Sequence, residues 1–274
     1  MMHVVRETRE TERLSHYVGV VATAWEGSFG REPVRLVEGR DTDAVVVGTT
    51  AVFRFPRNHA ALDALPREVA ALTALNEAGR VDDVLPNVLV DSLQNPLGRA
   101  FVAQRYLGGD PLPRASVDAV GPMAYRFAVE LARLLDALAA TPATGLPLTS
   151  APLYDDWDTL AAAAGPAAAT AFADVKALDK PDPVLVHGDL NDRALRWDAD
   201  DTRLTGVLGW SQVHLGDPAY DLASLADGYG WDLAETVAAA TARADRDVMR
   251  RARVYAATFP FQRSLGGTPA PRRA

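Results

Sequence analysis

The chain has 274 residues and a formal net charge of −8, from 28 basic and 36 acidic residues. Hydrophobic residues make up 48% of the sequence and charged residues 23%, a composition typical of globular proteins that excludes wholesale disorder. The absence of cysteine excludes disulfide frameworks, thiolate metal sites and cysteine nucleophiles.

Charge and hydropathy also restrict the partners that we expect. The apolar runs are too short to span a bilayer, and the first residues lack the charged start and apolar stretch of a secretory signal. We therefore expect a cytoplasmic protein with no membrane partner. A net charge of −8 repels phosphate backbones, which argues against a nucleic-acid partner, and attracts a cationic small molecule. The sequence leaves the oligomeric state open.

The first hundred residues predict a lobe of mixed strand and helix. A helix is expected with Pro66 in its first turn, apolar residues along one face and Gly79 at its C-terminal cap. Short β-branched and aromatic runs separated by turns predict five strands, at 34–37, 44–47, 51–55, 88–90 and 101–104.

The texture becomes helical after residue 108. Leucines at helical spacing predict a buried helix over 125–140, and a second helical region over 155–177 is interrupted at Gly165-Pro166. Short strand-like runs follow at 184–186, 195–197 and 204–210, and the last two flank an acidic turn and predict one hairpin within this half. Helices return from residue 221. These patterns predict an α+β protein with a sheet-rich N-terminal lobe, 1–106, and a helical C-terminal lobe, 107–274.

The most distinctive motif is Val-Leu-Val-His-Gly-Asp-Leu at 184–190, followed by Thr-Gly-Val-Leu-Gly-Trp at 205–210 and Gly-Asp-Pro-Ala-Tyr-Asp-Leu-Ala at 216–223. Here the chain resembles the aminoglycoside and macrolide phosphotransferases and their choline-kinase-like relatives. Residues 37–43 are similar to the family's nucleotide-covering turn, and residues 52–57 to its third strand. The resemblance implies the bilobal protein-kinase-like fold, with an antiparallel-sheet N-lobe and a helical C-lobe.

The resemblance also implies roles for three side chains. Phosphoryl transfer needs positioned phosphates, compensated charge and a carboxylate near the attacking hydroxyl. In the family pattern, Asp189 is that carboxylate, and Arg54 with Glu68 forms the ion pair on the phosphate side. Arg54 stands at the position of the family's phosphate-binding lysine, where many macrolide-type members also have arginine. No lysine occurs before Lys176.

Two positions depart from the family pattern. Ala194 stands five residues after Asp189, where the family has Asn or His, and Gly209 stands where it has a metal-binding Asp. Neither residue has a side-chain oxygen, whereas Mg²⁺ prefers hard oxygen ligands. Metal stabilisation is worth several kcal/mol, and each ~1.4 kcal/mol is about tenfold in rate. We therefore expect no metal site and no cofactor, with Mg-ATP required only if an unorthodox site replaces the lost ligands.

The residues that remain favour a repurposed family member that binds or transforms a small natural-product-type molecule. Asp189 is then the acid/base and His214, expected on the loop after Trp210, its candidate partner. His187 is expected to brace the loop, and Asp217 and Asp221 to be architectural. The candidate substrate contacts are Asn191, Asp192, Trp210 (also interpretable as packing) and Asp156.

Two alternatives stay open. The first is an active antibiotic phosphotransferase that moves the ATP γ-phosphate to a hydroxyl, with a metal held through Asp189 and Asp192. The second is a non-catalytic pseudokinase that serves as a binding module. By resemblance, the setting expected for the repurposed family member is antibiotic biosynthesis or resistance.

Overall fold

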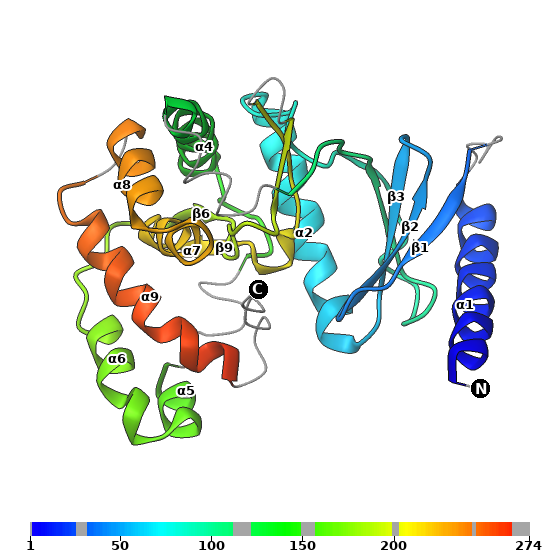
Figure 1. The fold of residues 1–274 in the computed structure, drawn as a ribbon, viewed down its shortest axis with the longest axis horizontal. Coiled ribbons are helices and arrows are strands. Elements are labelled where there is room, and N and C mark those ends of the chain that lie inside the picture. The colour runs from blue at the N-terminus through cyan, green and yellow to red at the C-terminus, as the bar shows by residue number, and fades with distance from the viewer. Residues whose placement is uncertain are drawn as a thin grey trace. The chain divides into compact units, whose positions relative to one another are not determined.

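The computed structural model describes residues 2–25, 32–111, 122–148, 157–198, 203–242 and 245–264. The chain divides into two compact units, Met1–Gly108 and Gly109–Ala274, the first built around a sheet and the second mainly from helices (Figure 1). The division expected after residue 106 lies two residues from this boundary.

The first unit contains the five predicted strands in one antiparallel sheet. The sheet order is β1-β2-β3-β5-β4, so the chain forms a three-stranded meander and then adds the last strand next to β3. The strands are β1 (Val34–Val37), β2 (Thr42–Val47), β3 (Ala51–Pro56), β4 (Val88–Asp91) and β5 (Val102–Arg105). The strands are confirmed, with ends that shift by one or two residues.

Alternation along the strands gives the sheet two different faces. Phe53 and Phe55 lie on one face, where helix α1 (Met2–Ala24) packs, and the Tyr17 ring of α1 stacks on Phe55 with centroids 4.0 Å apart. The sequence patterns did not predict α1. Figure 1 shows helix α2 (His59–Ala78) across the sheet from α1.

Helix α2 begins seven residues earlier than the prediction from Pro66. The Asn58 side chain caps the helix by accepting the Ala61 N–H at 2.8 Å. Because this cap stabilises the first turn, Pro66 lies inside the helix instead of at its start. The predicted C-terminal cap is confirmed, since Gly79 is left-handed and its N–H donates to the Asn76 carbonyl.

The second unit surrounds two small β elements with helices. Strand β6 (Val184–Val186) pairs with β9 (His214–Gly216), while β7 (Leu195–Asp198) and β8 (Arg203–Val207) form the predicted hairpin. The pairing of β6 with β9 was not predicted. The helical elements are α4 (Pro122–Ala140), α5 (Trp157–Ala164), α6 (Pro166–Lys176), the 3₁₀ turn η1 (Trp210–Gln212), α7 (Ala219–Tyr229), α8 (Trp231–Ala240) and α9 (Val248–Ser264). The predicted interruption at Gly165-Pro166 separates α5 from α6.

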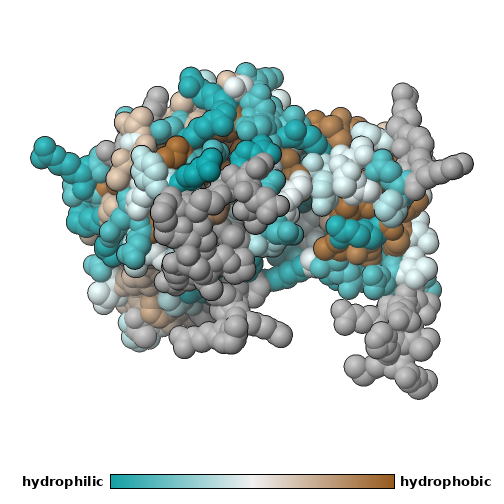
Figure 2. Space-filling model, turned by 45° about the horizontal axis from the view of Figure 1, so that its top comes forward, coloured by the Kyte–Doolittle hydropathy of each residue, from teal (hydrophilic) through white to brown (hydrophobic). Residues whose placement is uncertain are grey.

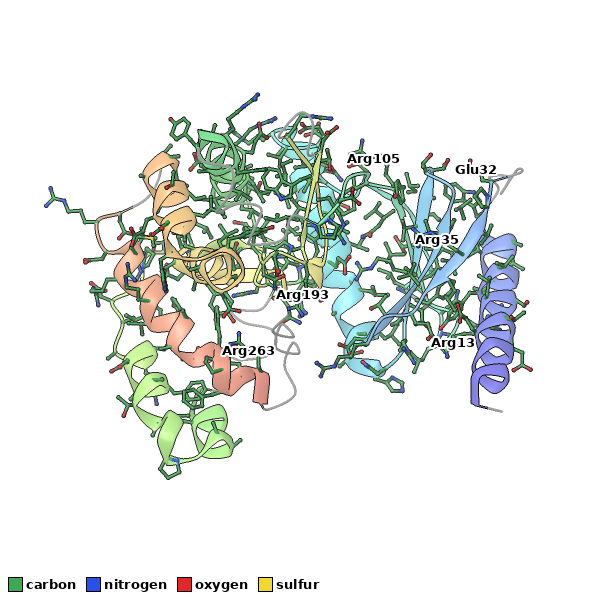
Figure 3. The ribbon with its side chains drawn as sticks, in the orientation of Figure 1. Arg13, Glu32, Arg35, Arg105, Arg193 and Arg263 are labelled. Carbon is green, nitrogen blue, oxygen red and sulfur yellow. The ribbon has the colours of Figure 1, made fainter. Side chains whose placement is uncertain are left out.

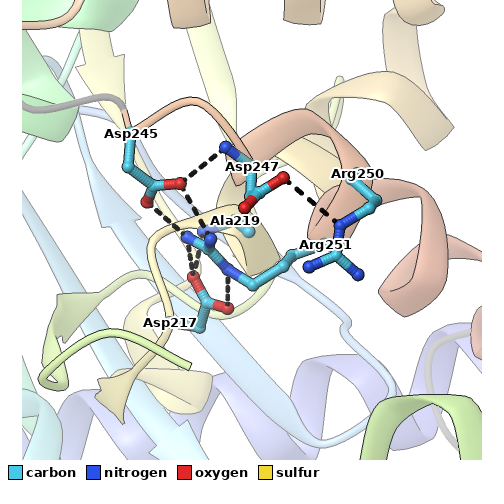
Figure 4. A network of polar contacts seen from close by, with 6 residues as sticks. All are labelled: Asp217, Ala219, Asp245, Asp247, Arg250 and Arg251. Carbon is cyan, nitrogen blue, oxygen red and sulfur yellow. Dashed lines mark hydrogen bonds and ion pairs between the residues drawn. The ribbon is translucent and has the colours of Figure 1, made fainter. Parts of the chain in front are cut away.

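A buried ion-pair network joins α9 to the segment before α7 (Figure 4). The Arg251 side chain is 3% exposed and donates to both carboxylate oxygens of Asp217, at 2.7 and 3.2 Å. The same guanidinium also donates to both oxygens of Asp245, at 2.9 and 2.7 Å. Asp217 Oδ1 in turn accepts the Ala219 N–H at the start of α7. The network confirms the architectural role expected for Asp217.

Few large apolar side chains are exposed on the described surface. In the view of Figure 2, hydrophilic side chains cover much of the described surface and hydrophobic ones form smaller patches. The exposed large hydrophobic residues are Val37, Leu89, Tyr125 and Val129. None of the helices in the described ranges combines the length and apolarity needed to cross a bilayer.

We expect Arg251→Met to destabilise the protein by about 3–5 kcal/mol, because the change leaves the Asp217 carboxylate buried without its partner. The matched control is Arg250→Met, which removes the same charge from an arginine that is 56% exposed and should cost no more than about 0.5 kcal/mol. Urea denaturation measures both. Equal losses would show that the buried network contributes no more than a surface arginine.

Candidate functional site

The loop after β6 is held in place by a carboxylate from α7. The backbone N–H groups of His187 and Gly188 donate to Asp221 Oδ2 and Oδ1, each at 2.8 Å. Burial raises the pKa of Asp221 to about 6, and the two N–H donors oppose that rise. The sequence predicted an architectural Asp221 near a helix start, and the structure adds that its carboxylate caps this loop.

His187 braces the same loop, as predicted. Its Nδ1 accepts the Asp189 N–H at 3.2 Å, so Nε2 carries the proton and donates to the Leu208 carbonyl at 3.0 Å. The ring also packs edge-on against Trp210, with centroids 4.6 Å apart. Burial lowers the pKa of His187 to about 4, so the imidazole is neutral near pH 7.

Asp189 has a tuned environment. Burial raises the pKa of its carboxyl to about 6, Arg193 opposes the rise, and Asp221 and Asp227 add to it by repulsion. Asn191 Nδ2 donates to Asp189 Oδ1 at 2.6 Å, which orients the carboxylate. A carboxylate with a pKa near 6 is mostly ionised at neutral pH and can accept a proton.

Both polar atoms of Asn191 are engaged within the loop. Its amide nitrogen donates to Asp189, and its carbonyl oxygen accepts the Arg193 N–H at 3.0 Å. The contact with α7 is close at the same point, because a Cβ on Gly228 would lie 2.8 Å from the Asp192 nitrogen. Asn191 therefore positions the loop, in place of the substrate contact that the sequence predicted. Contact between Asp192 and substrate stays a prediction.

The two predicted departures from the metal-binding pattern lie next to each other. The Leu208 N–H donates to the Ala194 carbonyl at 2.8 Å, which brings Gly209 beside Ala194. A Cβ on Gly209 would meet no heavy atom within 4 Å among the described residues, so the space beside this glycine is open. Across the described ranges, no three His, Asp or Glu side chains gather in a metal-binding arrangement. The two family positions therefore offer no side-chain oxygen to a magnesium ion, while Asp192 keeps a carboxylate in the same loop, so the absence of a metal stays a prediction.

Trp210 and His214 are buried within the second unit. Trp210 is fully buried and its Nε1 donates to the Val207 carbonyl at 2.8 Å, so of the two predicted roles the structure supports packing and not substrate contact. His214 lies in β9 and not on a loop as expected, because β9 pairs with β6. Its Nδ1 contacts the Gln212 carbonyl at 2.7 Å. A catalytic role for His214 remains a prediction, and Asp156 lies outside the described residues.

The predicted phosphate-side pair forms within the first unit. Arg54 Nη1 donates to Glu68 Oε1, and Glu68 is fully buried. Gln104 of β5 donates its Nε2 to the same oxygen at 3.0 Å. The sequence analysis missed Gln104, although β5 pairs with β3 in a register that sets Gln104 opposite Val52 and on the face of Arg54.

Helix α1 supplies a second group of residues that the sequence analysis missed. Arg13 Nη1 contacts Glu38 Oε1 at 2.8 Å and donates to Asp43 Oδ2 at 3.1 Å, so it joins both ends of the turn over residues 37–43 (Figure 3). The Tyr17 hydroxyl also donates to Asp43 Oδ2, at 3.1 Å. Asp43 is fully buried, so these contacts hold the turn against α1.

Comparison with known proteins identifies the family. The model of the phosphotransferase enzyme family (APH) matches residues 33–255. The chain belongs to this family. Viomycin phosphotransferase of Streptomyces vinaceus is 28% identical over 245 residues, which cover 81% of this chain and 82% of that protein.

Solved structures share the fold. The aminoglycoside phosphotransferase APH(2")-IIIa, in complex with GDP and kanamycin, aligns with a TM-score of 0.76 and 23% identity over 92% of this chain and 91% of that one. The apoenzyme of the macrolide 2'-phosphotransferase MphH from Brachybacterium faecium aligns with a TM-score of 0.65 and 21% identity over 92% and 93%. The predicted kinase-like α+β fold is therefore confirmed.

Restoring the family residues should create a response to magnesium. We expect the double variant Ala194→Asn, Gly209→Asp to gain a Mg²⁺-dependent rise in melting temperature with ATP, because only ligands bound to the native state stabilise it. Gly209 has a positive φ of 82°, which Asp tolerates better than most residues. The two single variants serve as controls. An equal Mg²⁺ response in the unmodified chain would contradict the expectation.

Proposed function

We propose that the protein transfers a phosphoryl group from a nucleoside triphosphate to a hydroxyl of a cationic natural-product antibiotic. The observation that carries the proposal is the intact Asp189 loop, in which Asp221 holds the backbone and Asn191 orients the carboxylate. The family match over 33–255 supports phosphoryl transfer as the reaction class. It favours the active-phosphotransferase alternative over the repurposed protein that the sequence analysis preferred.

In this mechanism Asp189 accepts the proton of the attacking hydroxyl. A bond forms between the hydroxyl oxygen and the γ-phosphorus, the bond from that phosphorus to the β,γ-bridging oxygen breaks, and the nucleoside diphosphate leaves. The Asn191 contact leaves Oδ2 of Asp189 as the oxygen that receives the proton. His187 is neutral and engaged at both ring nitrogens, so its part is to hold the loop and not to transfer protons.

The antibiotic class follows from charge and from the relatives. A net charge of −8 attracts a cationic molecule over long range. Viomycin phosphotransferase is a relative at 28% identity, and two solved neighbours are complexes with kanamycin and with streptomycin and ATP. Viomycin is therefore the first acceptor to test, followed by kanamycin.

The test is transfer of labelled phosphate from ATP or GTP to viomycin or kanamycin. We expect Asp189→Asn to lower kcat by about 10²–10⁴-fold, because an amide cannot accept the hydroxyl proton. The matched control, Asp247→Asn, removes an exposed carboxylate that is 65% accessible and should leave the rate unchanged. Equal rates for the Asp189 variant and the unmodified protein would refute the proposed role.

A second candidate function is binding, or acid/base chemistry, without phosphoryl transfer. The observation that favours it is the pair Ala194 and Gly209, which leaves the family's metal site without side-chain oxygens. Viomycin that raises the melting temperature but never receives labelled phosphate, with or without metal, would favour this candidate.

The pH dependence of the reaction tests the role of Asp189 separately. The ionised carboxylate is the form that accepts a proton, and burial raises the pKa of Asp189 to about 6. We therefore expect kcat/KM to rise with pH through about 6 and to fall roughly tenfold per unit below it. A profile that is flat from pH 5 to 8 would contradict this assignment.

Melting temperature is followed over the same pH range as a control. Burial also raises the pKa of Asp221 to about 6, so the folded state binds more protons than the unfolded chain between about pH 4 and 6. This group therefore makes the fold more stable as the pH falls through that window. A loss of rate at low pH with no loss of melting temperature excludes unfolding as the cause of the profile.

A further inference from the structure

The Asp189 loop lacks the family's metal ligands, so the positive charge that phosphoryl transfer needs must come from another group. Phosphoryl transfer requires positive charge to offset the charge of the transferring group, and the family supplies it through a metal ion. Ala194 and Gly209 lie side by side where the ligands of that ion belong, joined by the Leu208 N–H donating to the Ala194 carbonyl. A positive group that replaces the ion must therefore project from the same place.

Arg193 is the residue immediately before Ala194, and its backbone is fixed on both sides. Its N–H donates to Asn191 Oδ1 at 3.0 Å, and its carbonyl accepts from Arg196 Nη1 at 2.9 Å. The side chain of Arg193 is exposed, and Figure 3 shows it projecting from the loop after β6. The two contacts fix where the Arg193 side chain leaves the loop, one residue before Ala194.

The neighbouring charges place Arg193 within electrostatic reach of Asp189. Among the charged groups that act on Asp189, Arg193 is the cation, while Asp221 and Asp227 on α7 are repulsive. Asp227 has its own partner, because Arg263 Nη1 of α9 donates to Asp227 Oδ2 at 2.8 Å. Asp192 follows Asn191 in the loop, and its backbone lies against Gly228. The Arg193 charge therefore acts on the Asp189 carboxylate and lowers its pKa.

We propose that Arg193 replaces the missing metal ion by binding an anionic oxygen of the transferring phosphoryl group, so that nucleotide binding and transfer proceed without a divalent cation. Arginine clamps stabilise transferring phosphoryl groups in the same manner as metal ions, and the planar guanidinium matches phosphate geometry. The γ-phosphorus still passes from the bridging oxygen to the acceptor hydroxyl, and the hydroxyl proton still passes to Asp189. Arg193 forms no covalent bond.

This inference rests on the proposed function and is tested first by binding. ATP and GTP are titrated calorimetrically into the full chain in EDTA and again in excess Mg²⁺. We expect similar affinity in both solutions, and about a 10- to 100-fold loss for Arg193→Gln in EDTA, because a charge-assisted hydrogen bond to phosphate is lost. Arg193→Lys should retain part of the affinity, and Arg250→Gln is the matched control for removing one positive charge.

The outcomes separate this inference from the proposed function. Binding that requires Mg²⁺, or equal affinities for the Arg193 and Arg250 variants, overturns the role of Arg193 and leaves phosphoryl transfer standing. If Arg193→Gln changes the pH profile but leaves nucleotide affinity intact, Arg193 only adjusts the pKa of Asp189, and its proposed role in binding phosphate is overturned. No binding of either nucleotide in either solution overturns the proposed function, and this inference with it.

Discussion

The carboxylate of Asp221 accepts the backbone N–H groups of His187 and Gly188, and the position of Asp189 follows from those two contacts. A buried carboxylate is stable only when its oxygens are satisfied, and here the donors come from the loop that carries the chemistry. Asp221 belongs to α7, and α7 is fixed at its start by Asp217 and Arg251. The chain of contacts therefore runs from α9, through α7, to the candidate catalytic residue.

The environment of Asp189 is consistent with a general base near neutral pH. Burial raises the pKa of its carboxyl, while the Arg193 charge and the Asn191 amide limit the rise. The opposing effects leave a carboxylate that is ionised above about pH 6 and still basic enough to accept a proton. Asn191 also holds the loop through its contacts with Asp189 and Arg193, so the geometry of the loop does not depend on side-chain oxygens at positions 194 and 209.

The first unit repeats this pattern of buried carboxylates with basic partners. Glu68 receives hydrogen bonds from Arg54 and Gln104 across the face of the sheet, and Asp43 receives them from Arg13 and Tyr17 of α1. Arg54 supplies the cation of its pair in a chain whose lysines all follow residue 175. Since guanidinium donates in a fixed fork, it suits a buried carboxylate.

The sequence by itself determined the strands of the sheet and the hairpin in the second unit, and it predicted Asp189 as the catalytic carboxylate and Ala194 and Gly209 as departures from the family's metal-ligand positions. These features depend on residue type and local spacing, which are visible without a structure. Only the tertiary structure decided that α1 covers the aromatic face, that β9 buries His214 beside β6, and that Gln104 reaches Glu68. It also decided that Asn191 binds Asp189 and that Ala194 adjoins Gly209. Each of these contacts depends on how strands pair, how helices pack or how a loop turns. Residue spacing along the chain does not predict these arrangements.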